Sequence, residues 1–186
     1  MTIAVHRAAI VALACGCALL TLRPVLLDTV GADRAVPLLV ALFAMLLVAG
    51  AFWRGSLVTT TSHARQNAAV VFALGVGAFA MGRVLGGGEA PQAFVARFVV
   101  LNTLAAVAEE AFFRRLAYSA LAPGGAALQV VGSASLFALV HVTVYGWWVL
   151  PIDLAAGLLL SWQRWATGGW AVPAATHVVA NLLVVL

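Results

Sequence analysis

The chain has 186 residues, of which 65% are hydrophobic and only 9% are charged, and its mean hydropathy is +1.10. Soluble globular domains carry about 25% charged residues, so this composition excludes them and indicates an integral membrane protein. The net charge of +4 comes from basic residues that are scattered along the chain and form no run, which excludes nucleic acid as a partner.

Proline, glycine, arginine and aspartate residues divide the sequence into about seven apolar segments. A membrane-spanning helix needs about 20 mostly apolar residues, and the segments expected to form such helices are residues 8–27, 35–53, 67–85, 95–121, 127–149, 151–165 and 170–186. The first three breaks are expected at residues 23–37, 54–67 and 86–91, where charges, Gly and Pro interrupt the apolar pattern. The sequence therefore predicts an all-α fold, a polytopic transmembrane helical bundle of about seven helices.

The most unusual stretch is residues 104–118, LAAVAEEAFFRRLAY, in which four charges lie inside an apolar helix. Charges are costly at membrane depth, so they are expected to be paired or to take part in function. Glu110 and Arg114 are four residues apart on one helix and are expected to form an ion pair. Glu109 has a phenylalanine at the equivalent position, so it has no ion-pair partner four residues further on, and we expect it to be free for chemistry.

Two later segments bring ionisable side chains to a similar depth. The midpoint of predicted helix 95–121 falls near Glu109. The midpoint of helix 127–149 lies within one turn of His141, and that of helix 170–186 lies beside His177. Asn181 follows His177 by four residues and lies on the same helix face, while Phe137 precedes His141 by one turn and can form a wall. These positions predict a polar cluster inside the bundle.

The same residues have simpler interpretations. A single intramembrane His or Asn is more often a hydrogen-bonding group between helices than a catalytic group. The charges of residues 109–115 would then form an ion-paired structural cluster, or part of a path for ions or protons. Asp153, Asn102 and Gln129 are interpreted as solvated or packing residues, and Arg115 is a charge without an assigned role.

The polar patterns, taken in order, resemble the signature of one family of intramembrane endopeptidases. They read E-E-x-x-F-R at residues 109–114, F-x-x-x-H at residues 137–141 and H-x-x-x-N at residues 177–181. This series is similar to the three motifs of the CAAX-protease and bacteriocin-processing (CPBP, or ABI) family. The turn TGGWAVP at residues 167–173 also resembles that family, whereas Arg115 stands where many members have Gly.

The resemblance covers about residues 97–186 of what we expect to be a single membrane domain. It implies variable helices in residues 1–90 and a catalytic core in residues 91–186. A carboxylate in a dry bundle can serve as a general base, and two donors one turn apart can stabilise an oxyanion. The catalytic residues implied by the resemblance are Glu109, with Glu110 beside it, and His141, which activate water, and His177 and Asn181, which stabilise the oxyanion; Arg114 and Phe137 support them.

The resemblance favours a mechanism without a cofactor, because the better-understood members use glutamate rather than a metal. Zinc is the main alternative. Two Glu and two His can bind zinc with a water molecule in an open position, and the ligands would be Glu109, His141 and His177.

The implied activity is hydrolysis of a peptide bond in a membrane-tethered protein or peptide that reaches the site from the lipid bilayer. Substrates of the family include prenylated CAAX proteins, and a sortase-like enzyme that removes C-terminal anchors from exported proteins is the alternative. The small size is typical of a bacterial member in the inner membrane. The non-enzymatic alternatives are a proton or ion carrier and a bacteriocin-immunity scaffold. The sequence leaves the substrate and the oligomeric state open.

Overall fold

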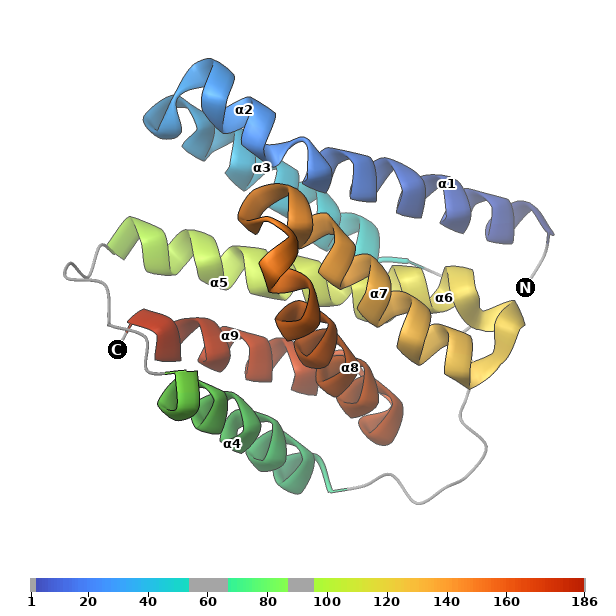
Figure 1. Ribbon diagram of the computed structural model, residues 1–186. Helices are drawn as coiled ribbons and strands as arrows, with labels where there is room; N and C mark the ends of the chain where they lie inside the picture. The colour runs from blue at the N-terminus through green and yellow to red at the C-terminus, as the bar shows by residue number, and fades with distance from the viewer. Residues whose placement is uncertain (1–2, 54–66, 87–95, 186) are drawn as a thin grey trace.

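The computed structural model describes residues 3–53, 67–86 and 96–185, and every regular element in these ranges is helical. The prediction of an all-α fold is confirmed (Figure 1). The α-helices are α1 (Ile3–Thr21), α2 (Arg23–Val30), α3 (Ala32–Ala51), α4 (Ala68–Gly86), α5 (Ala96–Ala111), α6 (Tyr118–Leu121), α7 (Gly125–Tyr145), α8 (Leu150–Thr167) and α9 (Ala171–Val185). A π-helix, η1 (Phe112–Ala117), joins α5 to α6, and two 3₁₀ turns are η2 (Ala122–Gly124) and η3 (Trp147–Val149).

The break predicted at residues 23–37 is wrong in its extent. Most of it is helical, because α2 begins at Arg23 and α3 begins at Ala32. Pro24 lies in the first turn of α2, where its missing N–H has no intrahelical partner to lose, so the helix tolerates it. The other two predicted breaks fall almost entirely on residues 54–66 and 87–95, outside the described residues.

Four stretches of the described chain are long and apolar enough to cross a membrane. They are Ala4–Thr21, Asp33–Ala51, Ala68–Gly86 and Ala96–Tyr145, and α9 adds the shorter apolar helix Ala171–Leu183. Large apolar side chains such as Val11, Leu74 and Val100 are exposed on the outside of the bundle, as expected for surfaces that contact lipid. The protein is therefore an integral membrane protein.

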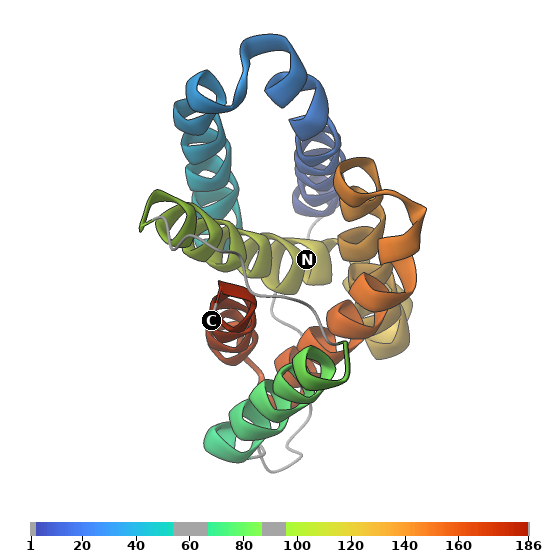
Figure 2. The same cartoon turned by 60° about the vertical axis from the view of Figure 1, so that its left-hand side comes forward.

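The long helix α5 occupies the centre of the bundle. It packs against α3 on one side and against α9 on the other, while α4 packs on α9 and α8. Figure 2 shows α1, α2 and α3 as an inverted U whose legs stand over α5. The antiparallel pair α7 and α8 closes the remaining side.

The core of the bundle forms where α1 and α3 meet the end of α5. Phe112, Phe113 and Leu116 are fully buried there against apolar residues of α1 and α3. Close approach of α3 depends on Gly50, since a Cβ at this position would overlap the backbone of Ala111. The two residues preceding Ala111 are Glu109 and Glu110, so this close helix packing fixes the position of the acidic pair.

Candidate active site

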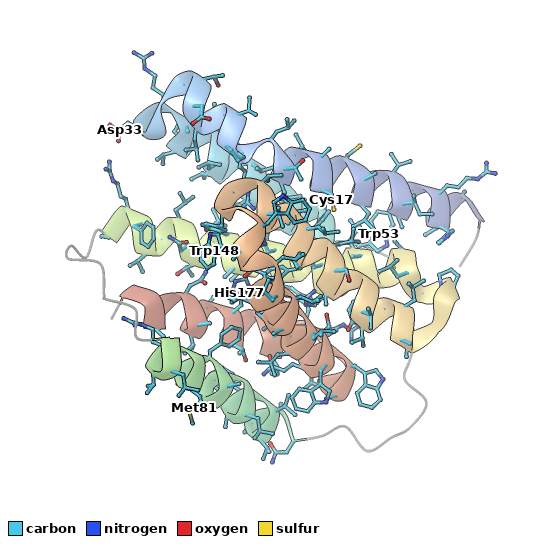
Figure 3. All side chains as sticks on the ribbon, in the orientation of Figure 1. Cys17, Asp33, Trp53, Met81, Trp148 and His177 are labelled. Carbon is cyan, nitrogen blue, oxygen red and sulfur yellow. The ribbon has the colours of Figure 1, made fainter. Side chains whose placement is uncertain are left out.

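A cavity of about 520 Å³ is lined by residues of α2, α3, α4, α5, α7, α8 and α9; we refer to it as the central cavity. Its polar lining residues are Arg23, Asn102, Glu109, His141, Tyr145, Asp153, His177 and Asn181. The structure thus brings together Glu109, His141, His177 and Asn181, which the sequence placed on three separate helices. Figure 3 shows His177 in the interior of the bundle, whereas Asp33 and Met81 lie on its outside.

Glu109 is buried at the wall of the central cavity, with 3% of its surface exposed. Its Oε1 atom lies 3.3 Å from Nη1 of Arg23, and its Oε2 atom lies 3.8 Å from Nε2 of His141. Phe113 stands four residues further on, as the sequence shows, but Glu109 does have a partner from another helix, because Arg23 reaches it from α2. Helical spacing describes only neighbours on the same helix, and this ion pair joins residues that are 86 positions apart.

Arg23 is itself held in place. Its Nε donates to the carbonyl oxygen of Leu20 at 3.0 Å, and its guanidinium lies 5.8 Å from the centre of the Phe43 ring. The side chain is 11% exposed. Arg23 therefore supplies the counter-charge that a carboxylate needs when it is buried in an apolar bundle.

Glu110 is fully buried and is not part of the lining of the central cavity. The predicted ion pair with Arg114 is present, with 3.0 Å between Oε2 and Nε. The other oxygen, Oε1, lies 3.1 Å from Nδ1 of His177. Because a carboxylate can only accept, Nδ1 of His177 carries the hydrogen. Glu110, on α5, thus links the Arg114 guanidinium of η1 to the His177 imidazole of α9.

The helix widens into the π-helix η1 directly after the acidic pair. Arg114 in this segment donates to Oγ of Ser133 at 2.6 Å, and Ser133 donates to the carbonyl oxygen of Phe113 at 2.8 Å. Arg164 on α8 donates to the carbonyl oxygen of Arg114 at 2.9 Å. Side chains of α7 and α8 therefore satisfy backbone carbonyls in the π-helix, a conformation often found at functional sites.

His141 has a defined orientation. Its Nδ1 lies 2.8 Å from the carbonyl oxygen of Phe137 and must donate to it, which leaves Nε2 directed toward Glu109. The ring stacks on Tyr145, with ring centres 6.0 Å apart and planes 5° apart. The 3.8 Å between Nε2 and the Glu109 carboxylate is too long for a direct hydrogen bond and suits a bridging water molecule.

Phe137 separates the two histidines, as the sequence predicted for a wall of the site. Its ring centre lies 4.6 Å from that of His141 and 5.7 Å from that of His177. Asn181 also lines the cavity, and its Nδ2 donates to the carbonyl oxygen of Asn102 at 3.3 Å. His177 and Asn181 both line the cavity from one face of α9.

Arg115 does not line the central cavity. Its Nε donates to the carbonyl oxygen of Trp53 at 3.3 Å, just after the end of α3. The charge to which the sequence gave no role therefore ties η1 to the end of α3.

Sequence reasoning missed four polar residues of the cavity lining, which are Arg23, Asn102, Tyr145 and Asp153. Asp153, interpreted as solvated or packing, lines the cavity, and its Oδ2 lies 3.9 Å from Nδ1 of His141. The sequence does contain a signal for Asp153: a tight turn between α7 and α8 places the first turn of α8 beside the last turns of α7. Arg23 has no comparable signal.

The described part of the chain contains no group of three or more His, Cys, Asp or Glu side chains arranged to hold a metal ion. Glu109 and His141 face each other, and His177 directs Nδ1 to Glu110.

An apolar helical bundle with a buried carboxylate, two imidazoles and an amide around one internal cavity has the features of a membrane-embedded hydrolase. Residues 91–183, half of the chain, match the family described as type II CAAX prenyl endopeptidase Rce1-like. The chain belongs to this family, which confirms the resemblance seen in its motifs and makes it a peptidase rather than a carrier or an immunity scaffold. Its substrate is a membrane-associated protein. No curated protein and no solved structure matches the chain.

Proposed function

We propose that this protein is a glutamate-type intramembrane endopeptidase in which Glu109 and His141 activate the attacking water. The observation that carries the proposal is that Glu109 Oε2 faces His141 Nε2 across 3.8 Å, inside a cavity shared with His177 and Asn181. A base, a hydrogen-bond acceptor for water and two oxyanion donors thus surround one space.

In the first step, a water molecule between Glu109 and His141 transfers one proton to the Glu109 carboxylate. The water oxygen bonds to the carbonyl carbon of the substrate, and the electron pair of the carbonyl bond moves to its oxygen. The resulting oxyanion accepts hydrogen bonds from Nε2 of His177 and Nδ2 of Asn181. Donors that are already in place lower the barrier most, because they need no reorganisation when the charge develops.

In the second step, the carbonyl bond re-forms and the carbon–nitrogen bond breaks. The proton held by Glu109 passes to the leaving nitrogen. The new carboxylic acid gives its remaining proton to Nε2 of His141 and leaves as a carboxylate. One water molecule has then been added across the peptide bond, and His141 returns its proton to solvent before the next turnover.

Glu110 acts through His177 in this scheme. It accepts the hydrogen on Nδ1, and this contact fixes the ring so that Nε2 is available to the oxyanion. A ring that donates from both nitrogens is an imidazolium, and the Glu110 carboxylate supplies its counter-charge. Arg114 in turn neutralises the second oxygen of Glu110.

We propose that the substrate is a lipid-anchored or membrane-tethered segment that reaches the cavity from the bilayer. In support, the cavity lining includes Phe98 and Ile152, which are 49% and 57% exposed and connect it to the apolar surface. A prenylated C-terminal segment is the favoured substrate, and the anchor of an exported protein is the second. The proposed location is the inner membrane of a bacterium, with a chain that crosses it several times.

The test is cleavage of an internally quenched, S-farnesylated CAAX peptide by the purified full-length protein in lipid nanodiscs. Glu109→Gln and His141→Ala are expected to reduce kcat by at least about 100-fold, the range typical of lost acid–base catalysis. Asp33→Asn is the matched control, because it removes a carboxylate that is 85% exposed. Undiminished cleavage by both site variants would refute the glutamate mechanism. An anchored precursor used as second substrate distinguishes the two substrate classes.

A further inference from the structure

Asp153 lines the central cavity but has no role in the steps described above. It lies in the first turn of α8, and its side chain is 18% exposed. Its Oδ2 atom is buried and has no hydrogen-bond partner within the described residues. A buried carboxylate oxygen without a donor destabilises the fold, so stability does not explain why an aspartate stands at this position.

The neighbour of Asp153 is the imidazole of His141. The distance from Oδ2 to Nδ1 is 3.9 Å, and on the opposite edge of the ring Glu109 Oε2 lies 3.8 Å from Nε2. The ring thus lies between two carboxylates. The hydrogen on Nδ1 already goes to the carbonyl oxygen of Phe137, so Asp153 acts on the ring by its charge rather than through that hydrogen bond.

The chain holds Asp153 at this place by close packing of α7 against α8. Gly157 lies one turn after Asp153 on the same face of α8, and a Cβ there would lie 3.0 Å from the carbonyl oxygen of Ala134. Ala134 is seven residues, about two turns, before His141 on α7. The two helices therefore meet along the line that contains both Asp153 and His141.

The other charged or titratable groups around His141 come from several elements. They are Glu109 from α5, Arg23 from α2, Tyr145 from α7 and His177 from α9. Arg23 is paired with Glu109, and His177 with Glu110. Within the part of the chain that the structure describes, His141 is the group at ion-pair distance from Asp153.

We propose that Asp153 is a positioning residue of the peptidase reaction, which compensates the positive charge that His141 acquires when Nε2 takes the proton of the new carboxylic acid. This inference rests on the proposed function, because it requires that His141 accept a proton during turnover. Opposite charges about 4 Å apart attract strongly in a partly buried site. Asp153 therefore acts on a step after the substrate has bound, and its charge matters more than its hydrogen-bonding capacity.

The test compares Asp153→Asn, which removes the charge, with Asp153→Glu, which keeps it, in the nanodisc assay with the farnesylated peptide. Asp153→Asn is expected to lower kcat by about 10- to 100-fold with KM changed less than about threefold, within the range of acid–base effects. Asp153→Glu is expected to recover most of kcat. Asp33→Asn, which removes a carboxylate that is 85% exposed, serves as the control.

A larger change in KM than in kcat would mean that Asp153 binds substrate, and an unchanged kcat would mean that it has no part in turnover; either result overturns the proposal. Glu109→Gln is measured in parallel. If Glu109→Gln is inactive while Asp153→Asn is fully active, only the role of Asp153 fails, whereas full activity of Glu109→Gln refutes the proposed function itself. If Asp153→Asn does not fold, Asp153→Ser provides a second charge-free variant, and weak activity of Asp153→Glu relative to the wild type counts against the proposal.

Discussion

Nη1 of Arg23 lies 3.3 Å from Oε1 of Glu109, so α2 completes the charge balance of an acidic residue that belongs to α5. Arg23 lies outside residues 91–183, the part of the chain that matches the endopeptidase family. The central cavity therefore combines family residues with a residue from the N-terminal helices. Substitutions in α2 are expected to affect catalysis even though the family motifs stay intact.

Arg23→Ala is expected to reduce activity by about 10- to 100-fold and to lower stability. Removing one member of a buried ion pair leaves an uncompensated charge and costs about 3–5 kcal/mol. The measurements are kcat in nanodiscs and the thermal unfolding midpoint followed by tryptophan fluorescence. Arg97→Ala is the matched control: its ion pair with Asp33 has side chains that are 72% and 85% exposed, so its loss should cost less than about 1 kcal/mol. Equal effects of the two substitutions would contradict the structural role of Arg23.

We expect Glu110→Gln and Glu109→Gln to differ in their effects on stability and on turnover. Glu110 pairs with Arg114 where both side chains are fully buried, so Glu110→Gln should lower both the unfolding midpoint and kcat. Glu109→Gln should abolish turnover with a smaller loss of stability, because Arg23 retains contact with Phe43 and the carbonyl oxygen of Leu20.

The double variant Glu110→Gln/Arg114→Met provides a check on this assignment. Replacing both partners by groups without charge removes the unpaired guanidinium, so part of the lost stability should return while activity stays low. Recovery of activity in the double variant would show that the Glu110–Arg114 ion pair serves only to neutralise its own two charges.

Gly50→Ala is expected to destabilise the bundle and reduce activity. The added Cβ would overlap the backbone at Ala111, which forces α3 away from α5, and overpacking of this kind costs about 1–3 kcal/mol. Gly77→Ala is the control, since its Cβ would meet no atom within 4 Å and should stabilise α4 by roughly 0.5–1 kcal/mol. A neutral Gly50→Ala variant would show that the contact between these helices is loose.

Treatment with 1,10-phenanthroline is expected to leave cleavage of the farnesylated peptide unchanged. This outcome follows from the proposed glutamate mechanism, in which Glu109 and His141 hold the water without an ion. The measurement is the initial rate before and after incubation with chelator, and again after addition of zinc. Loss of activity with chelator and its return with zinc would favour the zinc alternative over the proposed mechanism.

The parts of the site that the sequence predicted follow from spacing along one helix or from a common depth in the membrane. Residues four positions apart are neighbours on one face of a helix. This spacing predicted the ion pair of Glu110 with Arg114 and the shared face of His177 and Asn181. The common depth of three helices also correctly placed Glu109, His141 and His177 around one cavity. These predictions needed only the helical period and the thickness of a membrane.

The parts that the sequence missed depend on how helices pack. The contact of Arg23 with Glu109 requires α2 to be a helix that reaches over α5, and the sequence predicted a break there because Arg, Pro and Asp interrupt the apolar pattern. The position of Asp153 depends on the close approach of α7 and α8 at Gly157. The wide turn of η1 likewise depends on donors from Ser133 and Arg164, which lie on other helices.

The cavity draws on α2, near the beginning of the described chain, and on α9, which leaves the ribosome after all the other elements that line it. A partly synthesised chain that lacks α9 has neither His177 nor Asn181. In such a chain, Oε1 of Glu110 also lacks its partner, the imidazole of His177. Under the proposed mechanism, in which His177 and Asn181 hold the oxyanion, the active site is therefore complete only when synthesis has reached α9.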